Sequence, residues 1–120
     1  MLHMSQRQIG LLILRYGLAA LFLWFGFSQL ADGINWVSWV PDWIVNLVHL
    51  PPAMIVLANG LFEVITAILL SLGLFVRPVA FLLAAHLALI TIEIGANAIG
   101  VRDFGLTMAI LSLAFMYTGE

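Results

Sequence analysis

The sequence predicts an all-α integral membrane protein: a four-transmembrane-helix bundle with an interfacial or re-entrant helical segment between the first two helices. Two observations lead to this fold class. The 120-residue chain is 64% hydrophobic and only 8% charged, whereas a soluble domain carries about 25% charged residues. Proline and glycine also divide the apolar sequence into four runs, close to the ~20 residues that a spanning helix needs. At this length we expect one membrane domain, residues 1–120.

The first half of the chain is expected to hold two spans. The first runs over about residues 7–31 and ends at Gly33, a suitable C-cap. Residues 34–50 contain three tryptophans and a central Pro41, which is typical of a segment that lies at the membrane interface. The second span, about 53–75, follows two prolines that favour a helix start.

The second half is expected to hold two more spans. A tight turn anchored by Arg77 leads into the third span, about 78–96. The fourth span, about 103–118, is expected to begin at Asp103 because aspartate is a good N-cap.

The arginines predict the orientation of the chain. Arg7 and Arg77 fall on the side of the termini, with Arg15 just inside the membrane, and Arg102 falls on the other side. The positive-inside rule therefore places both termini in the cytoplasm. We expect a multi-pass protein of the cytoplasmic (inner) membrane of a prokaryote. The first apolar run is too long, and carries too central a charge, for a cleaved signal peptide.

Composition also excludes several kinds of chemistry. The chain has no cysteine, which excludes thiol exchange and thiolate or iron–sulfur ligation by this chain. There is no basic patch, so we expect no nucleic-acid partner. Metal-ligand spacing is absent, and the only candidate set would be Glu63, His86 and Glu93, so no metal site is expected. We expect no intrinsic cofactor.

The polar residues within the spans are the candidate site. At ~1.5 Å per residue, Arg15, Glu63 and His86 lie about 12, 16 and 12 Å from the cytoplasmic end. Because a buried carboxylate needs a partner to stay ionised, we predict that Arg15 pairs with Glu63, with His86 as the next partner.

A second polar level is expected further out. It comprises Gln29, Asn59 and Glu93, with Arg102 and Asp103 within reach. Across the bundle interior, small residues are expected to allow close helix approach, namely Gly17, Gly26, Gly60 and Gly73. On the first span, Arg15, Phe22, Gly26 and Gln29 share one stripe.

Two questions stay open at the level of the sequence. The polar layer is either a ligand or proton site, or a structural latch that fixes helix register. The tryptophans at 36, 39 and 43 are either interfacial anchors or a platform for a quinone or a lipid headgroup.

Four stretches taken together resemble the DoxX family of small four-helix membrane proteins. They are "LRYGLAALFLWFGFSQL", "NGLFEVITAILLSLGLFVRPVA", the broken segment between them, and "VRDFGLTMAILSLAF". The residues that carry the resemblance are Arg15, Gly60, Glu63, Gly73, Arg77, Arg102, Asp103, Gly105 and Leu106. The resemblance implies a four-helix bundle associated with membrane oxidoreductases. Some related proteins carry cysteines and this chain has none, which argues against a thiol-redox role.

The expected function is that of a DoxX-like accessory or quinone-proximal subunit of a membrane oxidoreductase, rather than an enzyme by itself. A quinone is the one ligand of cofactor type that we expect. The expected partners are membrane lipid and either other membrane subunits or a second copy of the chain. The alternative is a small proton-coupled transporter or channel acting as a homo-oligomer, with Glu63 and Glu93 as proton carriers.

Overall fold

The computed structural model describes residues 4–117, which form helices and connecting turns with no strand. The elements are α1 Gln6–Ala31, η1 Gly33–Asn35, η2 Val37–Trp39, α2 Asp42–Val48, α3 Pro52–Leu72, α4 Val76–Ile94 and α5 Ala98–Met116. Four of these helices, α1, α3, α4 and α5, are long and apolar enough to cross a membrane. The predicted fold class is confirmed.

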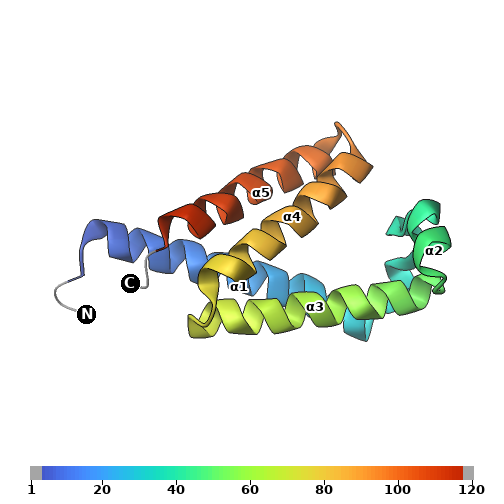
Figure 1. The fold of residues 1–120 in the computed structure, drawn as a ribbon, viewed down its shortest axis with the longest axis horizontal. Helices are drawn as coiled ribbons and strands as arrows, with labels where there is room; N and C mark the ends of the chain where they lie inside the picture. Colours follow the sequence, from blue (N-terminus) through green and yellow to red (C-terminus); the bar gives the residue numbers. More distant parts are fainter. Residues whose placement is uncertain (1–3, 118–120) are drawn as a thin grey trace.

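The spanning helices form two pairs, α1 with α3 and α4 with α5 (Figure 1). The pairs meet where α3 turns into α4 and diverge toward the opposite end of the molecule. The short elements η1, η2 and α2 lie at that diverging end. A cavity lined by both pairs and by this short segment occupies the divergence.

Two glycines bring α1 and α3 together. A Cβ atom on Gly60 would lie 2.9 Å from the carbonyl oxygen of Gly26, and one on Gly26 would lie 2.9 Å from that of Gly60. Only residues without a side chain permit this approach. Gly17 was expected to serve the same purpose but does not, because it is exposed and nothing lies within 4 Å of an added Cβ.

The helix α3 ends at Leu72, before the expected boundary at residue 75. Gly73 adopts a left-handed backbone with φ of 76°, and its N–H bonds back to the carbonyls of Leu69 and Leu70. This conformation ends helices and favours glycine. The helix α4 then begins at Val76, and Pro78 falls in its first turn, where a helix tolerates proline.

The helix α5 begins at Ala98, earlier than the expected start at residue 103. The side chain of Asn97 accepts a hydrogen bond from the Gly100 N–H, so Asn97 is the N-cap and the prediction of Asp103 was wrong. Both residue types cap well, so propensity does not choose between them. The early start puts Asp103 inside the helix, where it is buried. The expected last residue, 118, lies outside the described residues.

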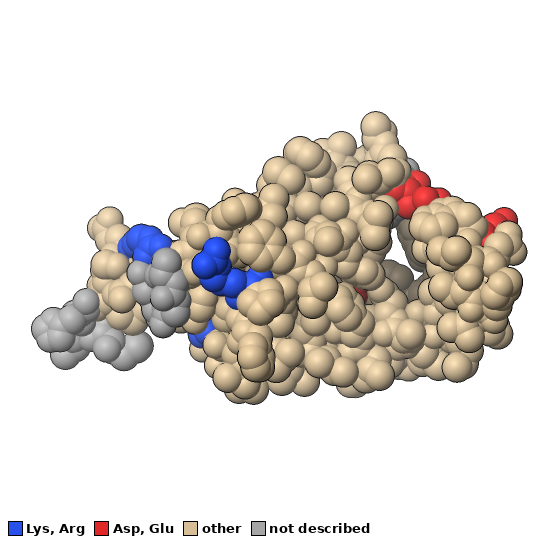
Figure 2. Space-filling view, in the orientation of Figure 1, with Lys and Arg blue, Asp and Glu red and all other residues tan. Residues whose placement is uncertain are grey.

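Arginine side chains bind helix carbonyls at the end of the molecule where α1 begins and α5 ends. Arg7 donates to the Met116 carbonyl at 2.7 Å, and Arg77 donates to the Ala114 carbonyl at 3.1 Å. Figure 2 shows Arg side chains at this end and Asp and Glu side chains at the other. Cations near a helix C-terminus interact favourably with its unpaired carbonyls. These contacts hold the starts of α1 and α4 against the last turn of α5.

A layer of apolar side chains joins the two pairs. The largest fully buried side chains come from all four spanning helices and are Phe22, Leu70, Leu83, Ile110 and Leu113. Phe22 also lines the cavity, and Leu70 lies three residues before Gly73, so this packing extends from the cavity wall to the turn between α3 and α4. Close packing of this kind leaves little space for water.

Candidate functional site

A cavity of about 340 Å³ lies between the two helix pairs and the segment 33–50. Figure 2 shows the surface hollowed between this segment and the tip of the α4–α5 pair. The walls of the cavity are mainly apolar and aromatic. They include Phe22 and Phe25 from α1 and Trp36 and Trp39 from the segment 33–50. Ligand sites are typically apolar cavities of this size class with a few convergent polar groups.

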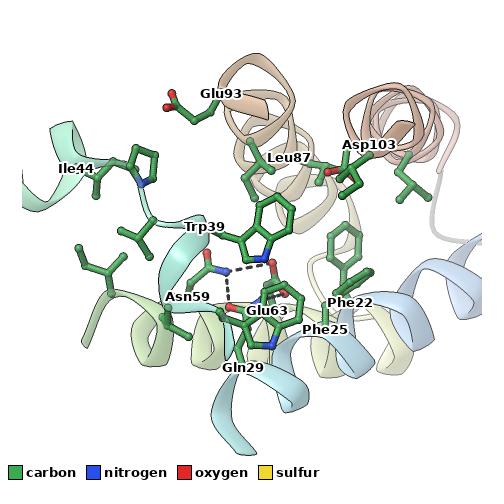
Figure 3. Close-up of a pocket in the computed structure, with 18 of the residues that line it drawn as sticks. Phe22, Phe25, Gln29, Trp39, Ile44, Asn59, Glu63, Leu87, Glu93 and Asp103 are labelled. Atoms are coloured by element: carbon green, nitrogen blue, oxygen red, sulfur yellow. Dashed lines mark hydrogen bonds between the residues drawn. The ribbon is translucent and has the colours of Figure 1, made fainter. Parts of the chain in front are cut away.

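Three polar side chains, Gln29, Asn59 and Glu63, form the floor of the cavity (Figure 3). Gln29 Nε2 donates to Glu63 Oε2 at 3.2 Å, and Asn59 Nδ2 donates to Glu63 Oε1 at 3.3 Å. Asn59 Nδ2 also donates to Gln29 Oε1 at 2.6 Å. Glu63 is only 4% exposed. Both carboxylate oxygens therefore accept hydrogen bonds, as a buried charge requires.

The local sequence explains how the floor is assembled. Asn59 and Glu63 lie one turn apart on α3, so their side chains share a face. Gln29 reaches them because Gly60, between them in sequence, lets α1 approach closely. The predicted stripe on α1 is confirmed, since Arg15, Phe22, Gly26 and Gln29 are all buried.

His86 approaches the floor from α4. Its Nε2 lies 3.5 Å from Glu63 Oε1 and has no hydrogen-bond partner among the described residues. The ring is tilted against Phe62, with centroids 5.1 Å apart. The structure thus brings the predicted Glu63 and His86 side by side. An imidazole next to a carboxylate is suited to proton exchange, and that role stays a prediction.

The predicted pairing of Arg15 with Glu63 is wrong. Arg15 is buried, but its guanidinium lies against Gly73 at the end of α3. Gly73 follows Glu63 by ten residues, or about 15 Å along a helix. The depth count treated the helix ends as level, whereas α3 stops at Gly73 while α1 continues toward Gln6.

Other groups compensate the Arg15 charge. Its Cζ lies 4.8 Å from the ring centroid of Tyr16 and 6.0 Å from that of Tyr117. It also lies at the C-terminal end of α3, where the helix dipole favours a cation. Arg15 is therefore a structural element of the helix turn, remote from the cavity.

Asp103 and Arg102 form the opposite wall. Arg102 donates from Nε and Nη2 to Asp103 Oδ1 at 3.2 and 3.0 Å, and Asp103 is 4% exposed. The Arg102 guanidinium also lies 5.6 Å from the ring centroid of Phe25. Arg102 was expected within reach of Glu93 and Gln29. It lines the same cavity as both, but its carboxylate partner is its neighbour in sequence.

Glu93 lies at the mouth of the cavity. Its Oε2 accepts a hydrogen bond from the Trp43 indole N–H at 3.0 Å, which ties α2 to α4. The Trp36 indole N–H donates to Ser28 Oγ at 3.2 Å, which ties the segment 33–50 to α1. Among the described residues, no group of three acidic or histidine side chains is placed to hold a metal ion.

Sequence reasoning did not single out Phe25, which forms part of the wall and contacts Arg102. The available signal was its position four residues before Gln29, beside the polar stripe of α1. Nothing in the sequence placed the α1 aromatic residues opposite α5, because that contact depends on how the two pairs diverge.

The family model for DoxX matches residues 10–96, from α1 to just past the end of α4. Comparison with curated proteins and with solved structures gives no match. The matched segment includes the floor of the cavity and His86, whereas α5 lies beyond it. Because the match covers more than half of the 120 residues, the chain belongs to the DoxX family of membrane proteins.

Proposed function

We propose that this protein is an accessory subunit of a membrane oxidoreductase and holds a quinone-class molecule in the cavity between its helix pairs. The observation that carries the proposal is a buried carboxylate, Glu63, held by two amides at the floor of an apolar, aromatic-walled cavity. Quinone chemistry requires an apolar site together with groups that form hydrogen bonds and exchange protons. The floor supplies the hydrogen-bonding groups, and His86, which lies 3.5 Å from Glu63 but outside the cavity lining, would exchange a proton with that carboxylate.

The chain itself supports an accessory role. It has no cysteine to ligate an iron–sulfur cluster, and its described residues lie almost entirely within or beside the four spanning helices. Electrons exchanged with a bound quinone would therefore pass to or from a partner subunit. A stable complex with other membrane subunits is the assembly that this function requires.

Binding of a quinone is the first test. The protein would be reconstituted in nanodiscs and incubated with a short-chain quinone that carries a photoreactive azide. We expect cross-linked peptides from the cavity walls. Asn59→Leu, which removes both Asn59 N–H contacts at similar side-chain size, should weaken binding about tenfold or more. Ser71→Ala, on the same helix but away from the cavity, should leave binding unchanged. Cross-links spread evenly over the lipid-facing surface would refute a specific site.

The alternative, a proton-coupled transporter or channel, has less support. The apolar layer that contains Phe22, Leu70 and Leu83 extends from the cavity wall toward the turn between α3 and α4. A conducting path would have to open through this packed layer or run between copies of the chain. Native mass spectrometry distinguishes the two functions. A hetero-complex would favour the redox subunit, and a homo-oligomer would favour the transporter.

We propose a prokaryotic inner-membrane location with both termini in the cytoplasm. Arg7, Arg15 and Arg77 lie toward the end where α1 begins and α5 ends, and Arg102 lies on the cavity side. The chain has no native cysteine, so single cysteines at Ser5 and Asn46 report orientation directly. A membrane-impermeant maleimide should label the Asn46→Cys variant in intact cells and spare Ser5→Cys. The reverse pattern would refute this orientation.

A further inference from the structure

The hydrogen bonds at the floor run in one direction. Both Glu63 oxygens accept, and the donors are the amide groups of Gln29 and Asn59. The Asn59 amide nitrogen makes two contacts, one to Glu63 and one to Gln29 Oε1, which together match its two hydrogens. Figure 3 shows the Asn59 oxygen turned away from Glu63. The Glu63 carboxylate thus accepts from both amides, and the floor presents acceptor oxygens together with the second hydrogen of the Gln29 amide.

The remaining acidic groups of the cavity follow the same pattern. Asp103 accepts from Arg102 on the opposite wall, and Glu93 accepts from Trp43 at the mouth. The cavity lining therefore contains three carboxylates, Glu63, Glu93 and Asp103, against the single guanidinium of Arg102. With these groups ionised, the formal charge of the lining is −2. Such a lining disfavours anions, and the Glu63 carboxylate disfavours ligands that present only acceptor atoms to it.

This pattern discriminates between the two redox forms of a quinone. The oxidised form offers carbonyl oxygens, which only accept hydrogen bonds. A quinone carbonyl that faces the Glu63 carboxylate therefore forms no hydrogen bond with it, because neither group has a hydrogen to donate. The reduced form, a quinol, offers two hydroxyl groups. A carboxylate oxygen has about two lone-pair sites. Glu63 Oε2 retains one after accepting from Gln29, whereas Oε1 accepts from Asn59 and also lies 3.5 Å from His86 Nε2.

We propose that the cavity selects a hydroxylated aromatic ring, the reduced quinol in preference to the quinone, with a ligand hydroxyl donating to Glu63. This rests on the proposed function and names the redox form that the site prefers. A hydrogen bond to a charged acceptor in a site of low polarity gives a preference of about tenfold or more. The aromatic walls at Phe22, Phe25 and Trp39 provide apolar contact for the ring.

The test compares the two redox forms on one preparation. The protein in nanodiscs would be titrated anaerobically with a short-chain quinone and with the corresponding quinol kept reduced, with empty nanodiscs as the blank. Tryptophan fluorescence reports binding because Trp36 and Trp39 line the cavity. We expect the quinol to bind about tenfold more tightly or better.

Two matched variants locate the preference. Glu63→Gln replaces one acceptor oxygen by an NH₂ donor at nearly the same size, so the preference for the quinol should disappear or reverse. Asp42→Asn makes the same carboxylate-to-amide change at an exposed position in the first turn of α2 that does not line the cavity, and should leave the ratio of the two affinities unchanged. If Glu63→Gln does not fold, the ratio measured on the unaltered protein still decides the question.

The possible outcomes are distinct. Equal binding of both forms, or tighter binding of the quinone, overturns the inferred preference and leaves the proposed function standing. Binding of neither form overturns the proposed function as well. A hydrophobic ammonium ion that binds more tightly than the quinol would overturn the hydroxyl donor as the selected group, because a cation would then satisfy the acidic lining better.

Discussion

The contact between Gly26 and Gly60 makes Gly60→Ala a sharp test of how α1 and α3 pack. The new Cβ would lie 2.9 Å from the Gly26 carbonyl oxygen and 2.9 Å from the Gln29 Cβ. Neither neighbour is the free end of a flexible side chain, so the helices must move apart. Overpacking of this kind costs about 1–3 kcal/mol, and alanine returns roughly 0.5–1 kcal/mol of helix propensity. We expect a net loss of about 0.5–2 kcal/mol in the free energy of unfolding.

The chain provides its own control for this measurement. Gly17 and Gly105 also lie within spanning helices, but nothing lies within 4 Å of a Cβ added to either. Gly17→Ala and Gly105→Ala should therefore be neutral or stabilising, by roughly 0.5–1 kcal/mol. Equilibrium unfolding in mixed micelles, followed by far-UV circular dichroism, measures all three variants. If Gly60→Ala is as stable as Gly17→Ala, the close backbone contact does not exist and the reasoning fails.

Three further substitutions test the remaining assignments. Arg15→Met should lower the free energy of unfolding by less than about 2 kcal/mol, because the guanidinium has no carboxylate partner among residues 4–117. A loss of about 3–5 kcal/mol would instead indicate that Arg15 pairs with Glu63. Gln29→Leu should lower the free energy of unfolding by about 1–3 kcal/mol, because it leaves Glu63 Oε2 without its hydrogen-bond donor. Equilibrium unfolding in mixed micelles measures this change. Trp43→Phe should speed amide hydrogen exchange in α2 by removing the bond to Glu93, and unchanged exchange would show that this bond does not hold α2 in place.

The sequence predicted features that depend on one helix at a time. The composition predicted four spans, and helical periodicity predicted that Phe22, Gly26 and Gln29 share a buried stripe. The one-turn spacing of Asn59 and Glu63 likewise placed both on one face.

The sequence failed where two helices had to be placed relative to each other. Arg15 was matched with Glu63 by counting residues from assumed helix ends, but α3 stops at Gly73, and the Gly26–Gly60 contact fixes the register. A shift of a few residues in a helix end moves a side chain by several ångströms. The same weakness misplaced Asp103, because Asn97 caps the helix equally well and starts it earlier.

The structure also bears on whether the polar layer is a latch or a site. A latch is needed where nothing else fixes the register, yet the contact between Gly26 and Gly60 already does so by shape alone. A buried charged network usually adds little stability over apolar packing of the same volume. The Glu63 carboxylate borders a cavity, and the adjacent His86 Nε2 lacks a hydrogen-bond partner among the described residues. Arg7 and Arg77, in contrast, bind helix carbonyls at the opposite end, where the structure needs cations. The charges at the arginine-bearing end thus have a structural purpose, whereas we propose that the Glu63 carboxylate at the cavity floor serves a ligand.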